Sequence, residues 1–441
     1  MKQTEINELI LLPESLNRED YVIGTYLIET NRDADILERS VAIALEQSTG
    51  TWVRVPQESD EIRVKYAAKV IGVYEIPDYE ILLPKQVELR YFIIQIAFPH
   101  VNFENQIPLL LTTTVGNLAC LGRIKLLDLE FPEKFLRNFK GPKFGIEGIR
   151  KLLGVFNRPL LNNMIKPCTG ITPETGAKLA YEAALGGVDI IKDDELLGGS
   201  PSFNNLRQRV KKYMEAIKKA DEEKGERTLY TVNITDSAKN LKDNALKAIE
   251  AGANAIMVNY LTVGLSNVRK LAEDPEINIP ILGHGDFGGA VYSSPYSGVS
   301  SPLIMAKLAR IVGVDMLIDI VPYGKVPLLR EKYLRIAQTL VSGLYHIKKV
   351  FPIAAAGVHP GMVPKIIEDL GLDCVLGVGG AIHGHPMGGV AGAKAMRQAM
   401  EAALTDIPLE EYAKMHKELR VAIDKWGIYN PEINIFKSIK D

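Results

Sequence analysis

The sequence predicts an α/β protein of two domains: an N-terminal α+β domain over residues 1–140 and a TIM (β/α)8 barrel over residues 141–405. A helical tail is expected over residues 406–441. Three observations support this prediction. Strand-like alternation dominates the first part of the chain, a short apolar run followed by a helical pattern repeats in the second, and the end is amphipathic with a helical period.

The first part mixes strands with helices. YVIGTYLIET (21–30) alternates like a strand, and ADILERSVAIALEQS (34–48) has the period of a helix. RVKYAAKVIGVYEI (63–76) and YFIIQIAFP (91–99) are rich in strand-forming residues. A helix between groups of strands is typical of a compact domain with an antiparallel or mixed, ferredoxin-like sheet.

The second part contains eight buried apolar runs of the kind found in parallel strands that are covered on both faces. They occur within about 250 residues, which is the size of a TIM barrel. The runs are PLLNNMIKP, GVDIIKDDE, TLYTVNIT, NAIMVNY, IPILGHG, VDMLIDIV, IAAAGV and CVLGVGG.

Active sites of such barrels lie at the C-terminal ends of the strands. Polar residues or glycines follow the apolar runs at that place in every case. They are Lys166, Lys192 to Glu195, Asn233, Asn259, His284, Lys325, Gly357 to His359, and Gly379 with Gly380.

Composition excludes several classes of function. The 52 basic and 54 acidic residues give a net charge of −2, which does not suggest a nucleic-acid or membrane surface. Cys120, Cys168 and Cys374 are too scattered for a disulfide framework, and the first residues lack the basic start of a signal peptide. We therefore expect a cytoplasmic protein.

The segment KDDE, residues 192–195, ends the second apolar run and is the most informative motif. Side chains alternate along a strand, so Lys192 and Asp194 point one way and Asp193 the other. Two carboxylates, Asp194 and Glu195, suit Mg2+. A protonated Lys192 cannot be a ligand, but carbamylation by CO2 would make it an anionic oxygen ligand. The alternative is a salt-bridged strand end without a metal.

GGVDIIKDDE resembles the carbamate and metal motif of the RuBisCO large-chain superfamily, and the resemblance extends through most of the chain. Further matching segments occur in the expected order: STGTW, GPKFGIEGIRKLLG, IKP, PYGK, GVHPGMVP and GVGGAIHGHP. The resemblance implies Mg2+, a carbamate on Lys192, and a homodimer in which the N-terminal domain completes the partner's active site. Assembly into higher multiples of the dimer stays open.

The resemblance also implies roles for single residues. Lys166 matches a lysine that manages the enolising proton, and Lys325 matches a mobile-loop lysine that meets CO2. Either could instead be a solvated lysine. Further matches are to partner-subunit contacts with substrate, at Glu46, Thr51, Trp52 and Asn117. Trp52 could equally be an ordinary core residue.

Glycines and one histidine complete the expected site. Gly357, Gly379 and Gly380 match a phosphate cradle, because glycine lets backbone N–H groups approach an anion closely. His284 matches a histidine at the barrel mouth, although lone histidines are often structural. The other histidines of the Gly-rich segments, His359, His383 and His385, are weaker candidates and do not suggest zinc.

Several residues depart from the family pattern and change the predicted function. Cys168, Ile318 and Ala355 stand where RuBisCO has a second lysine, a histidine and a serine, and no arginine follows His284. An apolar Ile318 cannot make a charge-assisted bond to a second phosphate. The sequence therefore indicates a RuBisCO-like protein that acts on a substrate with one phosphate, not a ribulose-bisphosphate carboxylase.

Three functions remain open. Much of the chain is similar to 2,3-diketo-5-methylthiopentyl-1-phosphate enolases, but these have a base lysine where this chain has Asn117, and they lack Lys325. The preferred prediction is a lyase or hydrolase, a decarboxylase or transcarboxylase/hydrolase of 3-oxo-isoapionate 4-phosphate. The alternatives are the methionine-salvage enolase (an isomerase-type reaction) and a non-catalytic sugar-phosphate binder.

Overall fold

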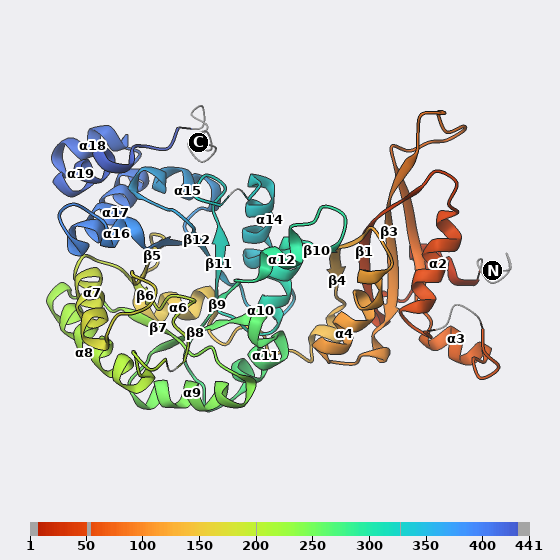
Figure 1. Cartoon of the computed structure of the whole chain (residues 1–441), viewed down its shortest axis with the longest axis horizontal. Coiled ribbons are helices and arrows are strands. Elements are labelled where there is room, and N and C mark those ends of the chain that lie inside the picture. The colour runs from red at the N-terminus through yellow and green to blue at the C-terminus, as the bar shows by residue number, and fades with distance from the viewer. Residues whose placement is uncertain (1–7, 51–53, 200, 327, 431–441) are drawn as a thin grey trace. The chain divides into compact units, whose positions relative to one another are not determined.

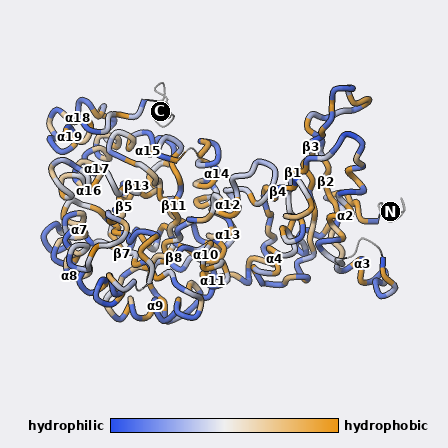
Figure 2. Tube along the Cα trace, viewed as in Figure 1, coloured by the Kyte–Doolittle hydropathy of each residue, from blue (hydrophilic) through white to orange (hydrophobic). Residues whose placement is uncertain are grey.

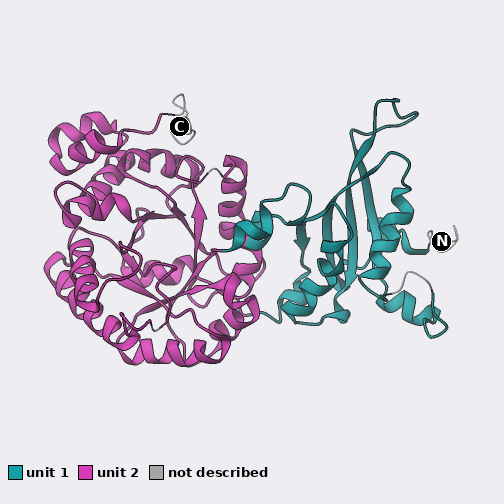
Figure 3. Ribbon diagram, viewed as in Figure 1, with its two compact units in different colours: residues 1–139, 287–304 teal, residues 140–286, 305–441 magenta. Residues whose placement is uncertain are grey.

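The computed structural model describes residues 8–50, 54–199, 201–326 and 328–430. The chain divides into two compact units, shown in Figure 3. Unit 1 comprises residues 1–139 and 287–304, and unit 2 comprises residues 140–286 and 305–441. The segment 287–304 lies between two barrel strands in sequence, yet it clusters with the N-terminal residues.

Unit 1 is built on a five-stranded mixed sheet with strand order β10-β4-β1-β3-β2. β1 is the central strand: it pairs antiparallel with β3 from Tyr21 opposite Pro99, and antiparallel with β4 on its other side. β10 joins β4 in parallel, which is how the segment 287–304 becomes part of this unit. The strands are β1 (Tyr21–Asn31), β2 (Lys69–Ile76), β3 (Leu89–Pro99), β4 (Ile124–Glu130) and β10 (Gly298–Val299).

Two of the helices described in unit 1 begin at side-chain caps. The Asp35 side chain accepts hydrogen bonds from the N–H groups of Leu37 and Glu38 at the start of α2. The helices of this unit, shown in Figure 1, are α2 (Ile36–Glu46), α3 (Asp60–Tyr66), α4 (Ile107–Thr114), α5 (Glu133–Leu136) and α12 (Gly288–Tyr292).

One strand prediction in this unit is wrong at its beginning. RVKY, residues 63–66, is the last turn of α3, and β2 starts only at Lys69. The Ser59 side chain accepts the N–H of Ile62, and Asp60 and Glu61 fill the first turn. A good cap and first-turn acids outweighed the strand propensity of Val64 and Tyr66.

Unit 2 is a closed barrel of eight parallel strands, which confirms the predicted fold. Each predicted apolar run forms one strand. In barrel order they are β11 (Met316–Ile320), β12 (Phe351–Ala355), β13 (Val375–Val378), β5 (Leu160–Met164), β6 (Ile190–Lys192), β7 (Leu229–Asn233), β8 (Ala255–Asn259) and β9 (Ile281–His284).

Most helices of unit 2 form a ring around the strands in Figure 1. The helices of this unit are α6 (Gly145–Leu153), α7 (Pro173–Leu185), α8 (Leu206–Lys224), α9 (Ala238–Glu250), α10 (Tyr260–Val263), α11 (Leu265–Glu273), α13 (Leu308–Ile311), α14 (Arg330–Val341), α15 (Val363–Leu370), α16 (Gly380–His383), α17 (Gly389–Leu404), α18 (Leu409–Met415) and α19 (Lys417–Trp426). The single amphipathic C-terminal helix expected from the sequence is thus two helices, because the backbone at His416 is extended.

The barrel interior is apolar at its N-terminal end. One cluster of buried side chains includes Leu160, Leu229, Leu282 and Phe351, together with Ile149 of α6. Figure 2 shows hydrophobic residues along the strands of this unit. Since alternate strand residues point inward, the next inward positions lie toward the C-terminal ends, where the polar residues were expected.

Candidate functional site

A cavity of about 540 Å3 lies over the C-terminal ends of the barrel strands. It collects eight of the predicted site residues, all from unit 2: Lys166, Asp194, Glu195, His284, Lys325, Gly357, Gly379 and Gly380. Apolar residues and further glycines supply most of the remaining lining. The prediction that these distant segments converge at one mouth agrees with the cavity.

Lys166 and Asp194 form the closest charged contact in this cavity. Lys166 Nζ lies 2.5 Å from Asp194 Oδ2 and donates to Cys168 Sγ at 3.0 Å. Burial disfavours the charged ammonium, but the hydrogen bonds and charges of Asp194 and Cys168 outweigh it and raise the pKa of Lys166.

The contact with Lys166 also changes the pKa of Asp194. Burial favours its neutral form, yet the hydrogen bond from Lys166 and a second one from the N–H of Leu196 lower its pKa. Asp194 is therefore ionised at neutral pH and available as an anionic ligand.

Lys192, the last residue of β6, is fully buried. Its Nζ donates to the carbonyl of Asp193 at 2.8 Å and lies 3.4 Å from Glu195 Oε2. Burial lowers the pKa of Lys192, and this effect exceeds the opposing charges of Glu195 and Asp194. A lysine with a lowered pKa presents more of the neutral amine, which is the form that reacts with CO2.

Glu195 lies between Lys192 and His284. His284 Nε2 is 3.4 Å from Glu195 Oε2, and His284 Nδ1 accepts the N–H of Asp286 at 3.2 Å. Burial opposes ionisation of Glu195, but the nearby Lys192 and His284 lower its pKa. Asp194 and Glu195 thus line the cavity, and the fully buried Lys192 lies beside Glu195.

Asparagines hold the backbone of the Asp194–Glu195 turn. Asn233 Nδ2 donates to the carbonyls of Asp194 at 3.1 Å and Glu195 at 3.3 Å, and Asn259 Nδ2 donates to the carbonyl of Glu195 at 3.0 Å. The polar ends of β7 and β8 therefore position the carboxylates.

Asp193 points away from the cavity, as strand alternation predicted. It accepts from Tyr230 Oη at 2.7 Å and from the N–H of Asn233 at 3.0 Å, and its Oδ2 lies 3.1 Å from Arg209 Nε. Asp193 and Arg209 are both fully buried. This ion pair anchors α8 against β6. No pattern in the sequence indicates that Arg209 is the partner of Asp193.

Two of the three predicted glycines, Gly357 and Gly379, leave little room for a side chain, whereas a Cβ on Gly380 would meet nothing within 4 Å. A Cβ on Gly357 would lie 3.0 Å from the backbone nitrogen of Lys325, and a Cβ on Gly379 would lie 3.3 Å from Lys166 Cε. Gly357 has φ of 103°, and its neighbour Ala356 also has a positive φ, 79°. The backbone at this end of the cavity is thus shaped for close approach, as a phosphate cradle requires.

The loop of Lys325 packs directly on the end of β12. The N–H of Lys325 donates to the carbonyl of Ala356 at 2.9 Å. A Cβ on Gly324 would lie 2.0 Å from that same oxygen, so Gly324 is required here. Lys325 itself is exposed and lines the cavity.

The other part of the cavity wall is apolar. Ile318 and Ile320 of β11 line it together with Met164, Met305 and Ala355. Met305 follows segment 287–304 and was not predicted, because no periodicity in the sequence indicates that it returns to the barrel mouth. An apolar wall here agrees with the inference that Ile318 and Ala355 do not bind a second phosphate.

Two expected residues of unit 1 lie together. Asn117 Nδ2 donates to Glu46 Oε1 at 3.1 Å, joining the end of α2 to the 310 turn after α4. Thr51 and Trp52 lie outside the described residues. The predicted role of this group at a partner's site stays a prediction.

The remaining histidines are separate from one another. Burial lowers the pKa of His359 and of His383 to about 4. His383 Nε2 lies 3.0 Å from Asn163 Oδ1, and His385 Nε2 lies 3.0 Å from the carbonyl of Glu418. In the described part of the chain, no three His, Cys, Asp or Glu side chains are grouped to hold a metal.

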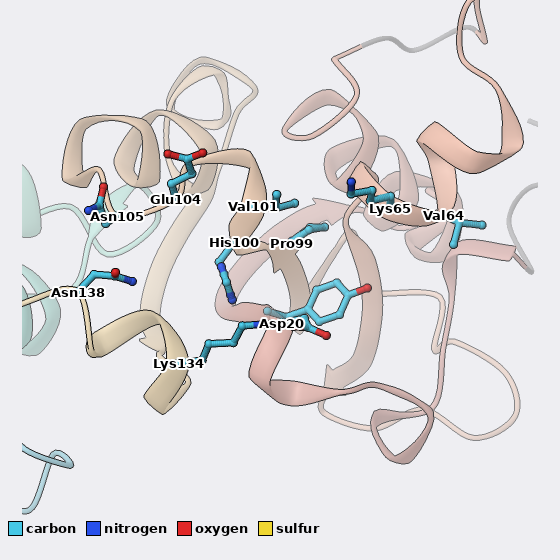
Figure 4. Close-up of a pocket in the computed structure, with 11 residues that line it drawn as sticks. Asp20, Val64, Lys65, Pro99, His100, Val101, Glu104, Asn105, Lys134 and Asn138 are labelled. Atoms are coloured by element: carbon cyan, nitrogen blue, oxygen red, sulfur yellow. Dashed lines mark hydrogen bonds and ion pairs between the residues drawn. The ribbon is translucent and has the colours of Figure 1, made fainter.

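A second cavity, of about 650 Å3, lies within unit 1 (Figure 4). Val64 and Lys65 of α3 lie on one side of it, and His100 and Lys134 on the other. Lys134 forms a 2.7 Å ion pair with Asp20, so its charge is already neutralised. This cavity contains none of the predicted site residues, so we assign the functional site to the smaller barrel cavity.

Comparisons with known proteins cover both units of the chain. The model of the ribulose bisphosphate carboxylase large chain, catalytic domain, matches residues 145–426, and the model of its N-terminal domain matches residues 13–135. A ribulose bisphosphate carboxylase-like protein of Archaeoglobus fulgidus is 53% identical over 406 residues, which cover 91% of this chain and 92% of that protein.

Two further relatives bear on function and assembly. A 2,3-diketo-5-methylthiopentyl-1-phosphate enolase of Geobacillus kaustophilus is 40% identical over 412 residues, covering 93% of this chain and 99% of the enolase. The dimeric archaeal Rubisco of Hyperthermus butylicus has a similar structure, with a TM-score of 0.85 and 32% identity over 96% of this chain and all of the other. Among the described residues, no helix is long and apolar enough to cross a membrane.

Proposed function

Because this chain belongs to the ribulose bisphosphate carboxylase large-chain family, we propose that it is an enzyme that enolises a keto substrate with one phosphate in the barrel cavity. The observation that supports this most is the cavity itself. It places three carboxylates (Asp194, Glu195 and Asp286), two lysines, a histidine and a glycine-lined end around one volume of about 540 Å3.

The cofactors we propose are Mg2+ and CO2, the latter as a carbamate on Lys192. Asp194 and Glu195 are two neighbouring carboxylates, and Asp286 lines the same cavity but is not grouped with them to hold a metal. A third anionic oxygen ligand beside them would come from another kind of group. The buried amine of Lys192, 3.4 Å from Glu195, fits that need once it is carbamylated. Mg2+ bound there would stabilise the negative charge that develops on a substrate oxygen during enolisation.

The chain's own residues bind the substrate and move the proton. Lys166 Nζ lies between Asp194 and Cys168, and the contact with Asp194 raises its pKa. That contact would be weaker with Mg2+ bound to Asp194, so that the amine of Lys166 could accept the proton of the reacting carbon. The backbone at Gly357, Gly379 and Gly380 holds the single phosphate. His284 fixes the orientation of Glu195 at the same end of the cavity.

The substrate that fits best is 2,3-diketo-5-methylthiopentyl-1-phosphate, the compound named for the relatives that are about 40% identical. It has a phosphate at one end and an apolar methylthio group at the other. The cavity offers the glycine-lined end for the first and the wall of Met305, Ile318 and Ile320 for the second. Burial of the tail against that wall is favourable by about 25 cal/mol per Å2.

The sequence alone favoured decarboxylation or transcarboxylation/hydrolysis of 3-oxo-isoapionate 4-phosphate. The enolase relatives support the alternative better, so enolisation is now the first candidate. Cleavage of a carbon–carbon bond, as in decarboxylation, is the second candidate, and one observation supports it. Lys325 lines the cavity, where its ammonium could pair with a carboxylate that is lost or transferred.

The test is to incubate the protein with each substrate, Mg2+ and bicarbonate, and to follow 1H and 31P NMR signals. Conversion of the diketo compound to its enol supports the first candidate. Release of CO2 or cleavage of the sugar acid, without enolase activity, replaces it with the second. A protein that binds Mg2+ and phosphate but converts neither compound is a binder. Lys192→Ala is the control and should be inactive in every case.

We further propose a homodimer with shared active sites. The similar structure of the Hyperthermus protein is described as dimeric. Glu46 and Asn117 provide a paired carboxylate and amide on unit 1, suited to polar groups of a substrate bound in a partner's barrel.

A further inference from the structure

Asn162 has a buried amide that meets no partner in the described structure. The residue lies in the middle of β5 and is fully buried. Neither its Nδ2 nor its Oδ1 accepts or donates a hydrogen bond. Buried side-chain amides are nearly always hydrogen-bonded, so an orphaned one in a barrel core calls for a ligand or an ordered group beside it.

The amide faces the interior, directly beneath the catalytic cavity. Leu160 belongs to the barrel core and Met164 lines the cavity, so alternation places Asn162 on the same inward face between them. On one side the ladder pairs Asn162 with Ile190, one inward position below Lys192. On the other side it pairs with Gly377, which lines the cavity and has no side chain to cover the amide.

A carbamate on Lys192 needs hydrogen-bond donors in this place. The neutral amine attacks the carbon of CO2, an N–C bond forms, one C=O electron pair moves to oxygen, and a proton leaves the nitrogen for solvent. The product has two oxygens bearing one negative charge. An oxygen of this group that does not bind the metal is buried and requires a donor.

The strands beside β6 offer few donors for it. The side chain of Met164 has no N–H or O–H group. Thr231 Oγ1 donates to the carbonyl of Ile191 at 3.2 Å, and Asn233 Nδ2 donates to the carbonyls of the Asp194–Glu195 turn. Lys166, beyond the end of β5, is already paired with Asp194 and Cys168. Among the inward-facing residues of β5 and β7, the amide of Asn162 is therefore the side-chain donor that is not already used.

We infer that Asn162 Nδ2 donates a hydrogen bond to the carbamate of Lys192, and that Asn162 is a positioning residue for this group. The inference rests on the proposed function, because it requires the carbamate. It predicts that Asn162 controls how readily CO2 binds, with no contact to the substrate.

The test measures carbamate directly by 13C NMR. The full-length protein is equilibrated with 13C-labelled bicarbonate and Mg2+ at increasing CO2, and the carbamate signal is assigned by its loss in Lys192→Ala. Asn162→Leu, which is similar in size and has no donor, should raise the CO2 concentration for half-carbamylation about tenfold, as expected for loss of a hydrogen bond to an anion. Asn162→Ala is the second variant, in case leucine does not fit.

Asn163→Ala is the matched control, because Asn163 is the neighbouring amide and binds His383 and the carbonyl of Val378. It should leave the CO2 dependence within twofold of the wild type. Without CO2, Asn162→Leu should unfold at the wild-type temperature or above it, because it removes an unpaired buried amide.

An unchanged CO2 dependence in both Asn162 variants, with a clear wild-type signal, would overturn the role of Asn162 and leave the proposed function intact. So would a loss of thermal stability in both variants without any change in carbamylation, since that describes a purely structural residue. Absence of any Lys192-dependent signal in the wild type refutes the carbamate and this inference together.

Discussion

At the scale of single residues, most charged groups of the cavity are paired with a charged neighbour. Lys166 pairs with Asp194, and Glu195 lies between Lys192 and His284. These pairs determine the charges at the site: Asp194 and Glu195 are ionised, while burial favours the neutral amine of Lys192. Replacing one member therefore changes the protonation of the other.

Replacing Lys166 tests the proton-transfer role. Lys166→Met keeps the length of the side chain but removes the ammonium, and kcat should fall by about 10²–10⁴-fold with a smaller change in KM. Cys168→Ser, which keeps a group able to accept from Lys166, should retain most of the activity. Steady-state kinetics at saturating Mg2+ and bicarbonate measure both. A Lys166→Met enzyme within a few-fold of wild-type kcat would remove Lys166 from the mechanism.

Two partly buried histidines, His359 and His383, predict a pH dependence of stability. His359 and His383 have pKa values of about 4 in the folded state, below the ordinary 6.5, so both are neutral when folded. The unfolding free energy is not reduced by these histidines above pH 6.5. It falls as the pH drops from 6.5 toward 4, because the histidines of the unfolded chain take up protons first. At pH 5 the loss is about 2 kcal/mol for each histidine.

Urea unfolding of the wild type and of His383→Asn at pH 7.5 and pH 5 measures this effect. The unfolding free energy of the variant should fall by about 2 kcal/mol less than that of the wild type between these pH values. The comparison between proteins is needed because buried Asp315, whose pKa burial raises to about 6, titrates with the opposite sign. Equal pH slopes for the two proteins would contradict the lowered pKa of His383.

At the scale of elements, one carboxylate connects three segments at the N-terminal end of the barrel. Asp315, just before β11, accepts the N–H groups of Phe144 at 2.7 Å and Gly145 at 2.8 Å, where α6 begins. It also accepts the N–H of Ile281 at 2.9 Å, at the start of β9. This contact holds α6 against the barrel core, at the end opposite the catalytic cavity.

Asp315→Ala should destabilise the protein by about 3–5 kcal/mol, because it leaves three buried N–H groups without an acceptor. Asp35→Ala, which removes the exposed cap of α2, is the matched control and should cost about 1 kcal/mol. Denaturant unfolding followed by circular dichroism measures both variants. If Asp315→Ala costs no more than Asp35→Ala, Asp315 does not connect these segments.

At the scale of the whole molecule, the proposed sharing of sites predicts complementation between inactive variants. Lys192→Ala removes the barrel half of the site, and Asn117→Asp alters the half expected from the N-terminal domain. If both are inactive alone, mixing and re-forming dimers should restore about a quarter of the wild-type rate. Half of the dimers are then mixed, and each mixed dimer has one intact site.

The activity of the re-formed mixture, compared with the two variants kept separate, is the measurement. A second mixture of Lys192→Ala with Asp194→Asn provides the control, since both changes affect the same barrel and should not complement each other. Absence of recovery in both mixtures, with re-formed dimers present, would indicate that each site is formed within one subunit.

The sequence by itself determined the eight barrel strands and the convergence of their polar ends, because burial on both faces and the period of two leave a direct pattern in the residues. It also placed Lys192 and Asp194 on the inward side and Asp193 on the outward side, by the same alternation. RVKY was assigned wrongly because the cap at Ser59 competes locally with strand propensity.

Only the tertiary structure decided which side chains meet. The pairing of Lys166 with Asp194, of Asp193 with Arg209, and the entry of Met305 into the cavity depend on barrel closure and on how the helices pack. The joining of β10 to β4 rests on two residues of pairing, too short to leave a pattern in the sequence. Local periodicity records which way a residue faces, whereas the partner it faces is set by the register between segments that lie far apart in the chain.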